Sequence, residues 1–458
     1  MAARAVLFSI LFVLVVPLPA EADAGTTVFR DVDVLYLDGD ARTERATVVV
    51  RDGRIESIGE RPDALPADAT VVGTCGGVLM PGLADMHVHF TGYEGSMFLG
   101  NSITTVRNLW GSSSTFVLDA QAKAGTIASP HIYSPGPLID GPEPIWGDSS
   151  LQVTSPEQVV GAVESQRTTG YRAVKLYEGL TPDIYRAAVA AAKERDMQVY
   201  THVPSGMTIE EVIDLGVDSI EHLDNVADSV FTEGPDDDGR AGTRWGMANE
   251  DKMRALAAHS AKAGVWHSPT FAVIAKRYEY GAEAGAYFAR PEMAYLGPGL
   301  RGWWQSSAAR MGPWDARLQS MAQQQRRFVK ILFDSGAPLL LGTDTPNPFV
   351  TPGFAIHDEL AAFVEAGIPV ADVLRIATAD AAKFLREEGK WGVIAAGARA
   401  DLVLLDADPR DDLNTLRRPC GTMVNGHWYS SAALQAELEK RAATIAAEAA
   451  ADDDVAGE

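Results

Sequence analysis

The chain has 458 residues, of which 46% are hydrophobic and 22% charged, a balance that indicates a folded globular protein with a substantial core. Its 39 Lys and Arg residues against 62 Asp and Glu residues give a net charge of −23 at pH 7. Because nucleic acids and anionic membrane surfaces would repel such a chain, we expect neither as a partner. A small molecule or a short peptide is the expected substrate. Assembly of the chain into a homo-oligomer stays an open alternative.

The first residues form a pattern typical of a secretory signal peptide. Arg4 precedes an apolar run over residues 5–16, and Pro17 and small residues follow up to Ala24. The run is too short to cross a bilayer comfortably, and no Cys follows it at a position for a lipid anchor. We therefore predict a signal peptide over residues 1–24, no stable membrane anchor, and a secreted or periplasmic protein. A retained anchor is the alternative.

Residues 25–80 alternate short β-branched runs with turn residues, and Asp52-Gly53 between two such runs indicates a hairpin. Similar runs return near the other end of the chain, at residues 400–406 and 421–429. We predict that residues 25–80 and 387–430 together form one small β-sandwich.

The two cysteines, Cys75 and Cys420, lie in these two β-rich stretches. Two cysteines provide neither a disulfide framework nor a Cys-based zinc site. In an exported protein their shared domain allows one bridge between them, and two free thiols are the alternative.

Between residues 81 and 386, apolar strand-like runs alternate with helical patterns such as residues 182–195 and 209–215. Eight strand-like runs are present, at residues 82–89, 103–109, 131–134, 173–177, 198–203, 219–222, 265–270 and 339–343. Eight β/α units predict an α/β fold of the (β/α)8 TIM-barrel class. In such a barrel, functional residues lie at the carboxyl ends of the strands.

Two segments depart from this regular alternation. Residues 272–326 form an insertion rich in Tyr and Trp, longer than an ordinary connection, which predicts a lid or a substrate wall and an apolar or aromatic group on the substrate. Residues 431–458 predict an Ala/Glu-rich helix over residues 432–450, followed by a disordered acidic tail at residues 452–454.

His87 and His89 form the strongest chemical signal, in the run Asp-Met-His-Val-His at the first predicted barrel strand. Side chains alternate across a strand, so both imidazoles face the same side, which at the end of a barrel strand is the mouth of the lumen. Two imidazoles there hold one metal ion. Asp85 shares this face at a deeper level and is expected to donate or accept a supporting hydrogen bond.

Further candidate ligands stand at the ends of later strands. Lys175 lies in the fourth strand, His202 at the end of the fifth, His222 at the end of the sixth and Asp344 directly after the eighth. Because strand ends meet at one rim of a barrel, these side chains are predicted to converge on a metal centre. Imidazole and carboxylate donors suit zinc best, with manganese or cobalt as substitutes.

These motifs resemble the amidohydrolase superfamily, and in particular its imidazolonepropionase-like and Xaa-Pro dipeptidase-like (prolidase-type) branch with a binuclear metal site. The resemblance spans about residues 26–430 and also includes Thr-Thr-Val-Arg at residues 104–107, Gly-Thr-Asp at residues 342–344 and Ala-Asp-Leu-Val at residues 400–403. It implies that Lys175 carries a carboxyl group from carbon dioxide and bridges two divalent ions. The alternative is that Lys175 pairs with a carboxylate and the site holds one ion.

The resemblance also implies roles for the other ligands. His87, His89 and Asp344 would bind the buried ion, and His202 and His222 the more exposed one. A hydroxide bridging the ions would be the nucleophile, with Asp344 as the general base and acid.

Four residues are weaker candidates for substrate contacts. Tyr177 shares the face of Lys175, His267 lies in the seventh strand, and Arg301 or Arg310 in the insertion would hold a free carboxylate as a bidentate pair. A core Tyr, a structural His and a surface Arg are the alternatives.

We interpret the chain as an exported metal-dependent amidohydrolase that cleaves a carbon–nitrogen amide bond, in dipeptides or N-acyl amino acids. A lactonase or a cyclic-amide hydrolase on the same site is the nearest alternative. A one-metal deaminase, in which His222 acts as an acid–base group, and a metal-dependent binding protein without turnover are the others.

Overall fold

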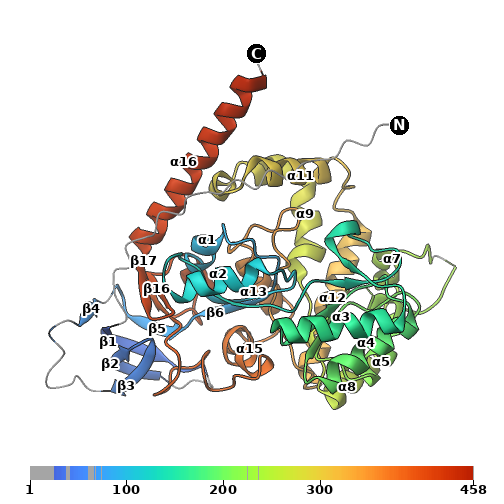
Figure 1. Ribbon diagram of the computed structural model, residues 1–458, viewed down its shortest axis with the longest axis horizontal. Coiled ribbons are helices and arrows are strands. Elements are labelled where there is room, and N and C mark those ends of the chain that lie inside the picture. Colours follow the sequence, from blue (N-terminus) through green and yellow to red (C-terminus); the bar gives the residue numbers. More distant parts are fainter. Residues whose placement is uncertain are drawn as a thin grey trace.

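The structure, a computed structural model, describes residues 25–37, 42–59, 67, 69–73, 75–223, 225–235 and 237–456. The predicted signal peptide lies outside these residues. Among them, no helix is both long enough and apolar enough to cross a membrane. A sheet at one end of the molecule adjoins a larger body of helices and short parallel strands (Figure 1).

The parallel strands of the larger body form two sheets. β6 (Leu83–Val88), β7 (Ile103–Asn108) and β8 (His131–Tyr133) make a three-stranded sheet. The other is six-stranded, in the order β10-β9-β11-β12-β13-β14. Its strands are β9 (Ile139–Asp140), β10 (Leu151–Gln152), β11 (Ala173–Leu176), β12 (Gln198–Thr201), β13 (Ser219–Glu221) and β14 (Trp266–Ser268).

Seven of the predicted strands coincide with β6, β7, β8 and β11 to β14. The eighth, near residues 339–343, is an extended segment held by single bridges, not a regular strand. It lies between the two sheets, because Asp344 N donates to His87 O (2.7 Å) on one side and Leu340 N donates to His267 O (2.8 Å) on the other. Asp344 in this segment has a left-handed backbone (φ 62°), which interrupts the extended conformation between the two bridges. The result is a mixed α/β fold with a TIM-barrel-like arrangement.

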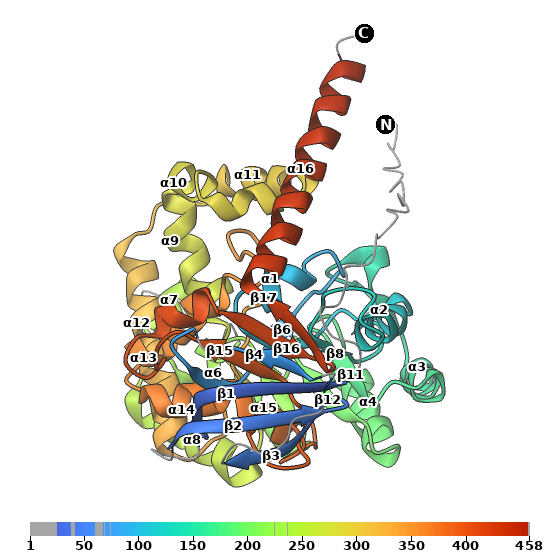
Figure 2. The same ribbon diagram turned by 90° about the vertical axis from the view of Figure 1, so that its left-hand side faces the viewer.

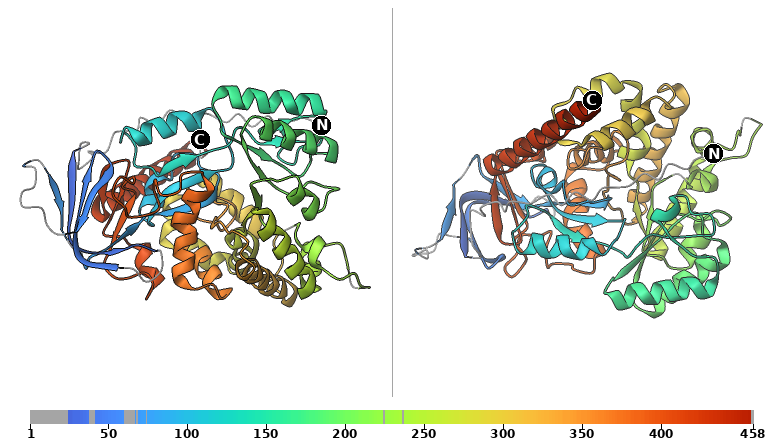
Figure 3. Two further views of the ribbon diagram at one scale, coloured as in Figure 1. Left: turned by 90° about the horizontal axis from the view of Figure 1, so that it is seen from below. Right: turned by 45° about the horizontal axis from the view of Figure 1, so that its top comes forward.

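Helices connect and cover the parallel strands (Figure 3). The connecting helices are α1 (Gly95–Leu99), α2 (Ser114–Lys123), α3 (Pro156–Thr169), α4 (Pro182–Glu194), α5 (Ile209–Asp214), α6 (Ala227–Val230), α7 (Ala241–Gly246), α8 (Glu250–Ala263), α12 (Ala316–Asp334), α13 (Ile356–Glu365), α14 (Val370–Arg375) and α15 (Ala381–Phe384). α4 and α5 match the two predicted helices and end one residue earlier. Their starts are set locally: Pro182 stands in the first turn of α4, and Thr208 and Glu211 form a capping box on α5.

Strands from both chain ends share one antiparallel and parallel sheet. Its order is β17-β16-β15-β5-β1-β2-β3, with β4 beside β1. The strands are β1 (Thr26–Leu35), β2 (Arg42–Arg51), β3 (Arg54–Gly59), β4 (Thr70–Val72), β5 (Val78–Pro81), β15 (Leu402–Leu405), β16 (Gly421–Val424) and β17 (His427–Ser430). They form one eight-stranded sheet, and its division into a sandwich of two layers stays a prediction.

The hairpin predicted at Asp52-Gly53 is confirmed. Arg51 of β2 pairs directly with Arg54 of β3, so the turn has two residues. Both Asp52 (φ 50°) and Gly53 (φ 72°) adopt the left-handed conformation that a two-residue hairpin turn requires.

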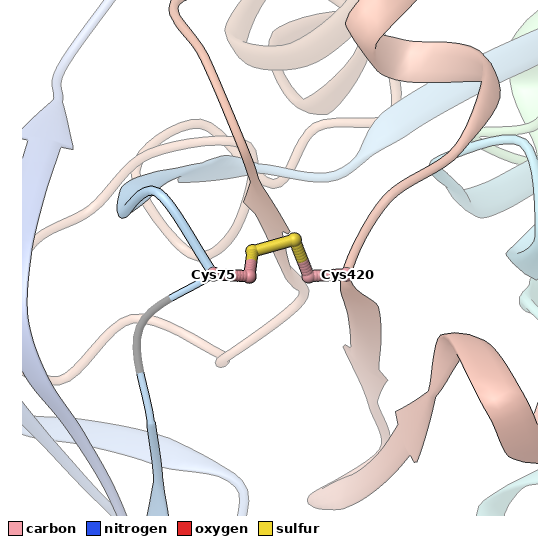
Figure 4. The surroundings of a disulfide bond; sticks show 2 residues. All are labelled: Cys75 and Cys420. Atoms are coloured by element: carbon pink, nitrogen blue, oxygen red, sulfur yellow. A yellow bond between two sulfur atoms is a disulfide. The ribbon is translucent and has the colours of Figure 1, made fainter.

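A disulfide joins Cys75, before β5, to Cys420, before β16 (Figure 4). The two Cα atoms are 6.3 Å apart, and 345 positions separate the residues in sequence. The alternative of two free thiols is therefore wrong. The bond links the N-terminal and C-terminal contributions to the shared sheet.

The insertion at residues 272–326 contains η2 (Ala272–Lys276), α9 (Arg277–Ala282), α10 (Ala284–Phe288), η3 (Pro291–Tyr295), α11 (Pro298–Ala308) and the start of α12. Its Tyr287 and Trp304 side chains are buried with Phe349 and Leu438 in a cluster of their own. These aromatic residues therefore form a core and not a ligand wall, because aromatic content alone does not distinguish the two.

The last helix, α16 (Ser431–Ala456), extends away from the body (Figure 2). Its first turns are anchored, since Leu434 and Leu438 are buried and Arg441 Nε donates to Tyr295 O at 2.6 Å. The acidic tail predicted to be disordered is instead part of this helix, which continues through Ala456. Helix propagation from an anchored start explains the difference, because each added residue then needs only one more hydrogen bond.

We expect the double variant C75S/C420S to lose about 2–4 kcal/mol of its free energy of unfolding, because the bond restricts the unfolded chain across a long loop. Denaturant unfolding measures this loss, and wild-type protein with reductant is the matched control. Equal stability of the variant and the unreduced wild type, or two free thiols in unreduced denatured protein, would contradict the disulfide.

Candidate metal centre

The six predicted ligand residues line one pocket at the carboxyl ends of the parallel strands. They lie on or directly after β6, β11, β12 and β13 and in the extended segment near residues 339–343. The parallel arrangement of the strands brings these positions together. These residues are His87, His89, Lys175, His202, His222 and Asp344.

Asp344 lies at the middle of the imidazoles. Its Oδ1 is 2.7 Å from His89 Nε2 and 3.3 Å from His87 Nε2, and its Oδ2 is 3.8 Å from His222 Nε2. His202 completes the group, with its ring centroid 4.6 Å from that of His222. Asp344 Oδ1 is buried and accepts no hydrogen bond despite these short distances, so the atoms face one another as ligands of a shared cation would.

The donor set fits a divalent metal ion. Ligand atoms of His87, His222 and Asp344 all lie within 4.8 Å of one another. Around a tetrahedral zinc ion with bonds of 2.0–2.1 Å, ligand atoms are about 3.3 Å apart, so the spacing of these three residues is compact enough for a metal centre.

Burial sets the protonation states that metal binding needs. It lowers the pKa of His202 and His222 well below the ordinary value, so both rings are neutral and keep a lone pair. Burial alone would raise the pKa of Asp344, but the nearby His87 and His222 outweigh it and the pKa lies well below its usual range. Asp344 is therefore an anion.

Lys175 is the unusual member of the group. It is 1% exposed, and its Nζ is buried without a hydrogen-bond partner. No carboxylate of the described residues lies within 4.0 Å of this nitrogen, which removes support for the alternative that Lys175 is ion-paired. Burial lowers the pKa of Lys175 to about 8, so about a tenth of the amine is uncharged at pH 7.

Three of the imidazoles are oriented by a hydrogen bond at Nδ1. His87 Nδ1 donates to Glu221 Oε2 (2.8 Å) and His202 Nδ1 donates to Glu178 Oε1 (2.9 Å). His222 Nδ1 donates to Thr270 Oγ1 (2.7 Å), whose own hydrogen goes to Pro269 O. With the hydrogen on Nδ1 in each bond, the lone pair lies on Nε2, where it is available to a metal ion.

Glu221 and Arg107 form a buried ion pair beneath the centre that sequence reasoning did not assign. Arg107 Nη2 donates to both carboxylate oxygens of Glu221 at 2.9 Å, and Ser219 Oγ donates to Glu221 Oε1 at 2.5 Å. The guanidinium is fully buried, 4.6 Å from the ring centre of Tyr200. The available signal was a charged residue at the buried end of a short strand, which requires a partner.

The backbone at the strand ends is specialised for this convergence. His222 (φ 65°), Thr270 (φ 52°) and Asp344 (φ 62°) all adopt the left-handed conformation, which is uncommon for residues other than glycine. Gly342 must be glycine, since a Cβ there would lie 2.7 Å from His87 Cβ. The last barrel segment thereby approaches β6 closely enough for Asp344 to reach the imidazoles.

Asp85 supports this close approach. Thr343 Oγ1 donates to Asp85 Oδ2 (2.7 Å) and Thr343 N donates to Asp85 Oδ1 (3.0 Å), while His87 N donates to the same carboxylate at 3.3 Å. Burial raises the pKa of Asp85 to about 7. The expected supporting hydrogen bonds are present, and they connect β6 to the segment that carries Asp344.

The pocket above the centre has a volume of about 160 Å³ and an aromatic wall. Tyr177 lines it as predicted, with its ring 4.2 Å from that of His202 and its hydroxyl accepting from Trp146 Nε1 at 2.8 Å. Trp110 and Trp146, from the connections after β7 and β9, supply most of the remaining aromatic surface, and neither was predicted.

Two other predicted substrate contacts are wrong in placement. His267 Nε2 bonds to Ser260 Oγ of α8 (2.9 Å), so its ring faces the helical layer and is not among the described residues that line the pocket. Arg301 lies on α11 and is likewise absent from that lining, as is Arg310. The reason is that α11 packs into the insertion's own cluster through Trp304, away from the pocket lining. Arg277 of α9 lines the pocket instead.

Comparison with known proteins gives three results. Residues 78–429 match the Amidohydrolase family profile. The ochratoxinase of Aspergillus niger is 23% identical over 412 residues, which covers 75% of this chain and 73% of the relative. Among solved structures, bottromycin amidohydrolase superposes with a TM-score of 0.78 at 25% identity, covering 94% of this chain and 93% of its own. A Xaa-Pro dipeptidase with bound methionine has a TM-score of 0.66 at 21% identity, over 89% of this chain and 100% of its own.

We expect Arg107→Met to leave Glu221 as an uncompensated buried anion, lowering the free energy of unfolding by about 3–5 kcal/mol and the zinc affinity by about 10–100-fold. Denaturant unfolding and zinc titration measure the two effects. The double variant R107M/E221Q should recover part of the stability and none of the zinc affinity, since His87 still lacks its carboxylate.

The matched control is Arg386→Met, which removes an exposed ion pair with Asp196 and should cost under about 1 kcal/mol. Wild-type zinc affinity in both R107M and the double variant would disprove the link from this pair to His87.

Proposed function

The chain belongs to the amidohydrolase family, and from this premise we propose that it is a metal-dependent hydrolase of the carbon–nitrogen bond in short peptides or N-acyl amino acids. The resemblance predicted from the sequence motifs is thereby confirmed. The observation that carries the proposal is the set of imidazoles around the Asp344 carboxylate, with an unpartnered buried lysine beside them, at the floor of a pocket. The names of its structural neighbours, a dipeptidase and an amidohydrolase, support an amide as the substrate.

The finer architecture belongs to the same proposal. We infer that the parallel strands and residues 338–345 make one (β/α)8 barrel, because that segment bonds to β6 on one side and to β14 on the other. At the other junction, β8 pairs with β7 in one sheet and the next strand in the chain, β9, pairs with β11 in the other. The chain therefore passes directly from one sheet to the other at this point, which supports the inference.

Two divalent ions, zinc by preference, are the proposed cofactor. His87, His89 and Asp344 would hold one, His202 and His222 the other, and a carboxylated Lys175 would bridge them. The buried, partnerless Lys175 amine supports the carboxylation, because a carboxylated nitrogen is an anion that two cations would satisfy. Bound ions would polarise the acyl carbonyl and lower the pKa of water to about 7.

The residues of the chain then have separate tasks. Asp344 Oδ1 is buried without a hydrogen bond among the imidazoles, so we assign to this atom the transfer of a proton to the leaving nitrogen. Glu221, Glu178 and Thr270 hold the imidazoles in place through Nδ1. The ring of Tyr177, packed on His202, covers one side of the centre and limits its access to water.

Ring opening of a lactone or a cyclic amide is the nearest alternative, and a substrate panel separates it from amide cleavage. A one-metal deaminase requires His222 as an acid–base group, and a binding protein requires no proton acceptor. The hydrogen bond from His222 Nδ1 to Thr270 favours a ligand role for His222 instead.

Export is a proposal supported by two observations. The sequence begins with a signal-peptide pattern, and a disulfide joins the only two cysteines. Disulfides persist in oxidising compartments, so a secreted or periplasmic location agrees with both.

We expect Lys175→Ala to reduce the metal content of purified protein from two ions per chain to one or fewer, because the bridging group is lost. Elemental analysis of dialysed protein measures the content, with Lys123→Ala, a surface substitution on α2, as the control. Two tightly bound ions in the Lys175→Ala protein would refute the bridging role.

We expect Asp344→Asn to lower kcat for amide hydrolysis by at least about 10³-fold with little change in thermal stability, because an amide neither accepts the proton nor supplies the negative charge. The control is Asp183→Asn, a highly exposed position on α4. Turnover within tenfold of wild type would remove Asp344 from the mechanism.

A further inference from the structure

The insertion contributes one cationic side chain, Arg277, to the pocket wall. Arg277 begins α9 directly after η2, and together with Val273 and Ile274 it lines the pocket. Positions three and four residues apart lie on one face of a helix, so the three side chains form a continuous strip of wall. This strip brings one guanidinium into the same cavity as the metal ligands.

The charge of Arg277 is not matched by the protein. No carboxylate of the described residues lies within 4.0 Å of it, and its Nε is buried without a hydrogen bond. Its contacts are a long hydrogen bond from Nη2 to the hydroxyl of Tyr278 (3.4 Å) and the face of that ring (5.0 Å).

Neighbouring cations in the insertion differ in this respect. Lys276 pairs with Glu279 at 3.1 Å, and Arg290 approaches Glu292 at 3.9 Å. In a chain with a net charge of −23, acidic partners are abundant. A guanidinium left unpaired in a partly buried pocket therefore indicates an anion that the ligand brings, and a guanidinium fork matches a carboxylate.

Most other side chains of the wall are aromatic or aliphatic, with Glu178 and Asn347 as polar members. The Trp110 and Trp146 rings meet edge to face at 5.6 Å, and Leu109 and Leu138 adjoin them. The hydrogen bond from Trp146 Nε1 to Tyr177 fixes the Trp146 ring at the mouth. The cavity of about 160 Å³ is close to the roughly 150 Å³ that one benzene ring fills in a protein core, so it accommodates one ring or one branched side chain.

We infer that Arg277 binds the free α-carboxylate of the substrate's C-terminal residue, and that Trp110 and Trp146 receive the apolar side chain of that residue. This inference rests on the proposed amide hydrolysis and names its substrate class: N-acyl or aminoacyl derivatives of apolar amino acids. Water oxygen bonds to the acyl carbon, the carbon–nitrogen bond breaks, and the nitrogen takes a proton. The products are a carboxylic acid and a free amino acid, with no other reactant consumed.

A matched pair of probes tests the assignment: N-acetylphenylalanine and its uncharged C-terminal amide, which share the same scissile bond and ring. We expect the wild type to prefer the acid by about 100-fold in kcat/KM, the effect of two charge-assisted hydrogen bonds. Arg277→Met should remove this preference by slowing hydrolysis of the acid while leaving that of the amide within about threefold. Arg301→Met, outside the pocket, should retain the full preference.

Binding of the same probes, measured by calorimetry on the same proteins, separates this inference from the proposed function. Acid-selective binding that Arg277→Met abolishes, without turnover of either probe, would sustain the Arg277 site and count against amide hydrolysis of this substrate class. Turnover without preference for the acid, or an equal loss on both probes in Arg277→Met, would overturn the Arg277 assignment and leave hydrolysis in place. Equal, Arg277-independent binding of both probes without turnover would contradict both.

Discussion

The centre depends on one buried ion pair, between Arg107 and Glu221. Burial by itself would raise the pKa of the Glu221 carboxyl, but Arg107 and Lys175 outweigh it, and the pKa lies well below its usual range. The resulting anion accepts the Nδ1 hydrogen of His87, and this fixes the lone pair of His87 on Nε2, facing Asp344. Without the guanidinium, the carboxylate would be neutral or unsatisfied, and the tautomer of the first ligand would no longer be set.

This pair also explains how a polar centre exists above an apolar interior. The opposite charges of Arg107 and Glu221 cancel within hydrogen-bond distance, and Arg107 additionally packs its guanidinium against the rings of Tyr200 and Phe384. The floor of the site therefore contributes little net charge to the region above it. Asp344 is then the anion in contact with the imidazoles, and burial keeps the rings of His202 and His222 neutral.

Much of the fold and the ligand set was predictable because both follow from local patterns. Strand-like runs between turn residues located seven parallel strands, and the positions of His87, His202, His222 and Asp344 at strand ends predicted that they line one rim. The last barrel segment is irregular for a tertiary reason: Gly342 and the left-handed Asp344 let it approach β6, and no propensity encodes this.

The supporting residues were less predictable, because their roles depend on contacts between distant parts of the chain. Glu221 and Arg107 are 114 residues apart in sequence, and Glu178 bonds to the ring of His202, 24 residues further along the chain. Trp110 and Trp146 reach the pocket from two separate connections. Aromatic richness favoured the insertion instead, but Tyr287 and Trp304 are consumed in packing with Phe349 and Leu438.

That packing gives the insertion its function in the pocket. A segment with its own buried aromatic cluster is held to the body, with the hydroxyl of Tyr287 donating to Phe349 O at 2.8 Å and Trp304 Nε1 donating to Pro346 O at 3.0 Å. Both anchors lie just beyond Asp344, so the wall that carries Arg277 is fixed relative to Asp344. The candidate metal-holding residues at the strand ends and the substrate-facing residues of the insertion are thus two separate groups. Residues 344–349 connect them. Because of this separation, side chains of the insertion wall can differ in size and charge without disturbing His87, which Glu221 and Asp85 hold from below.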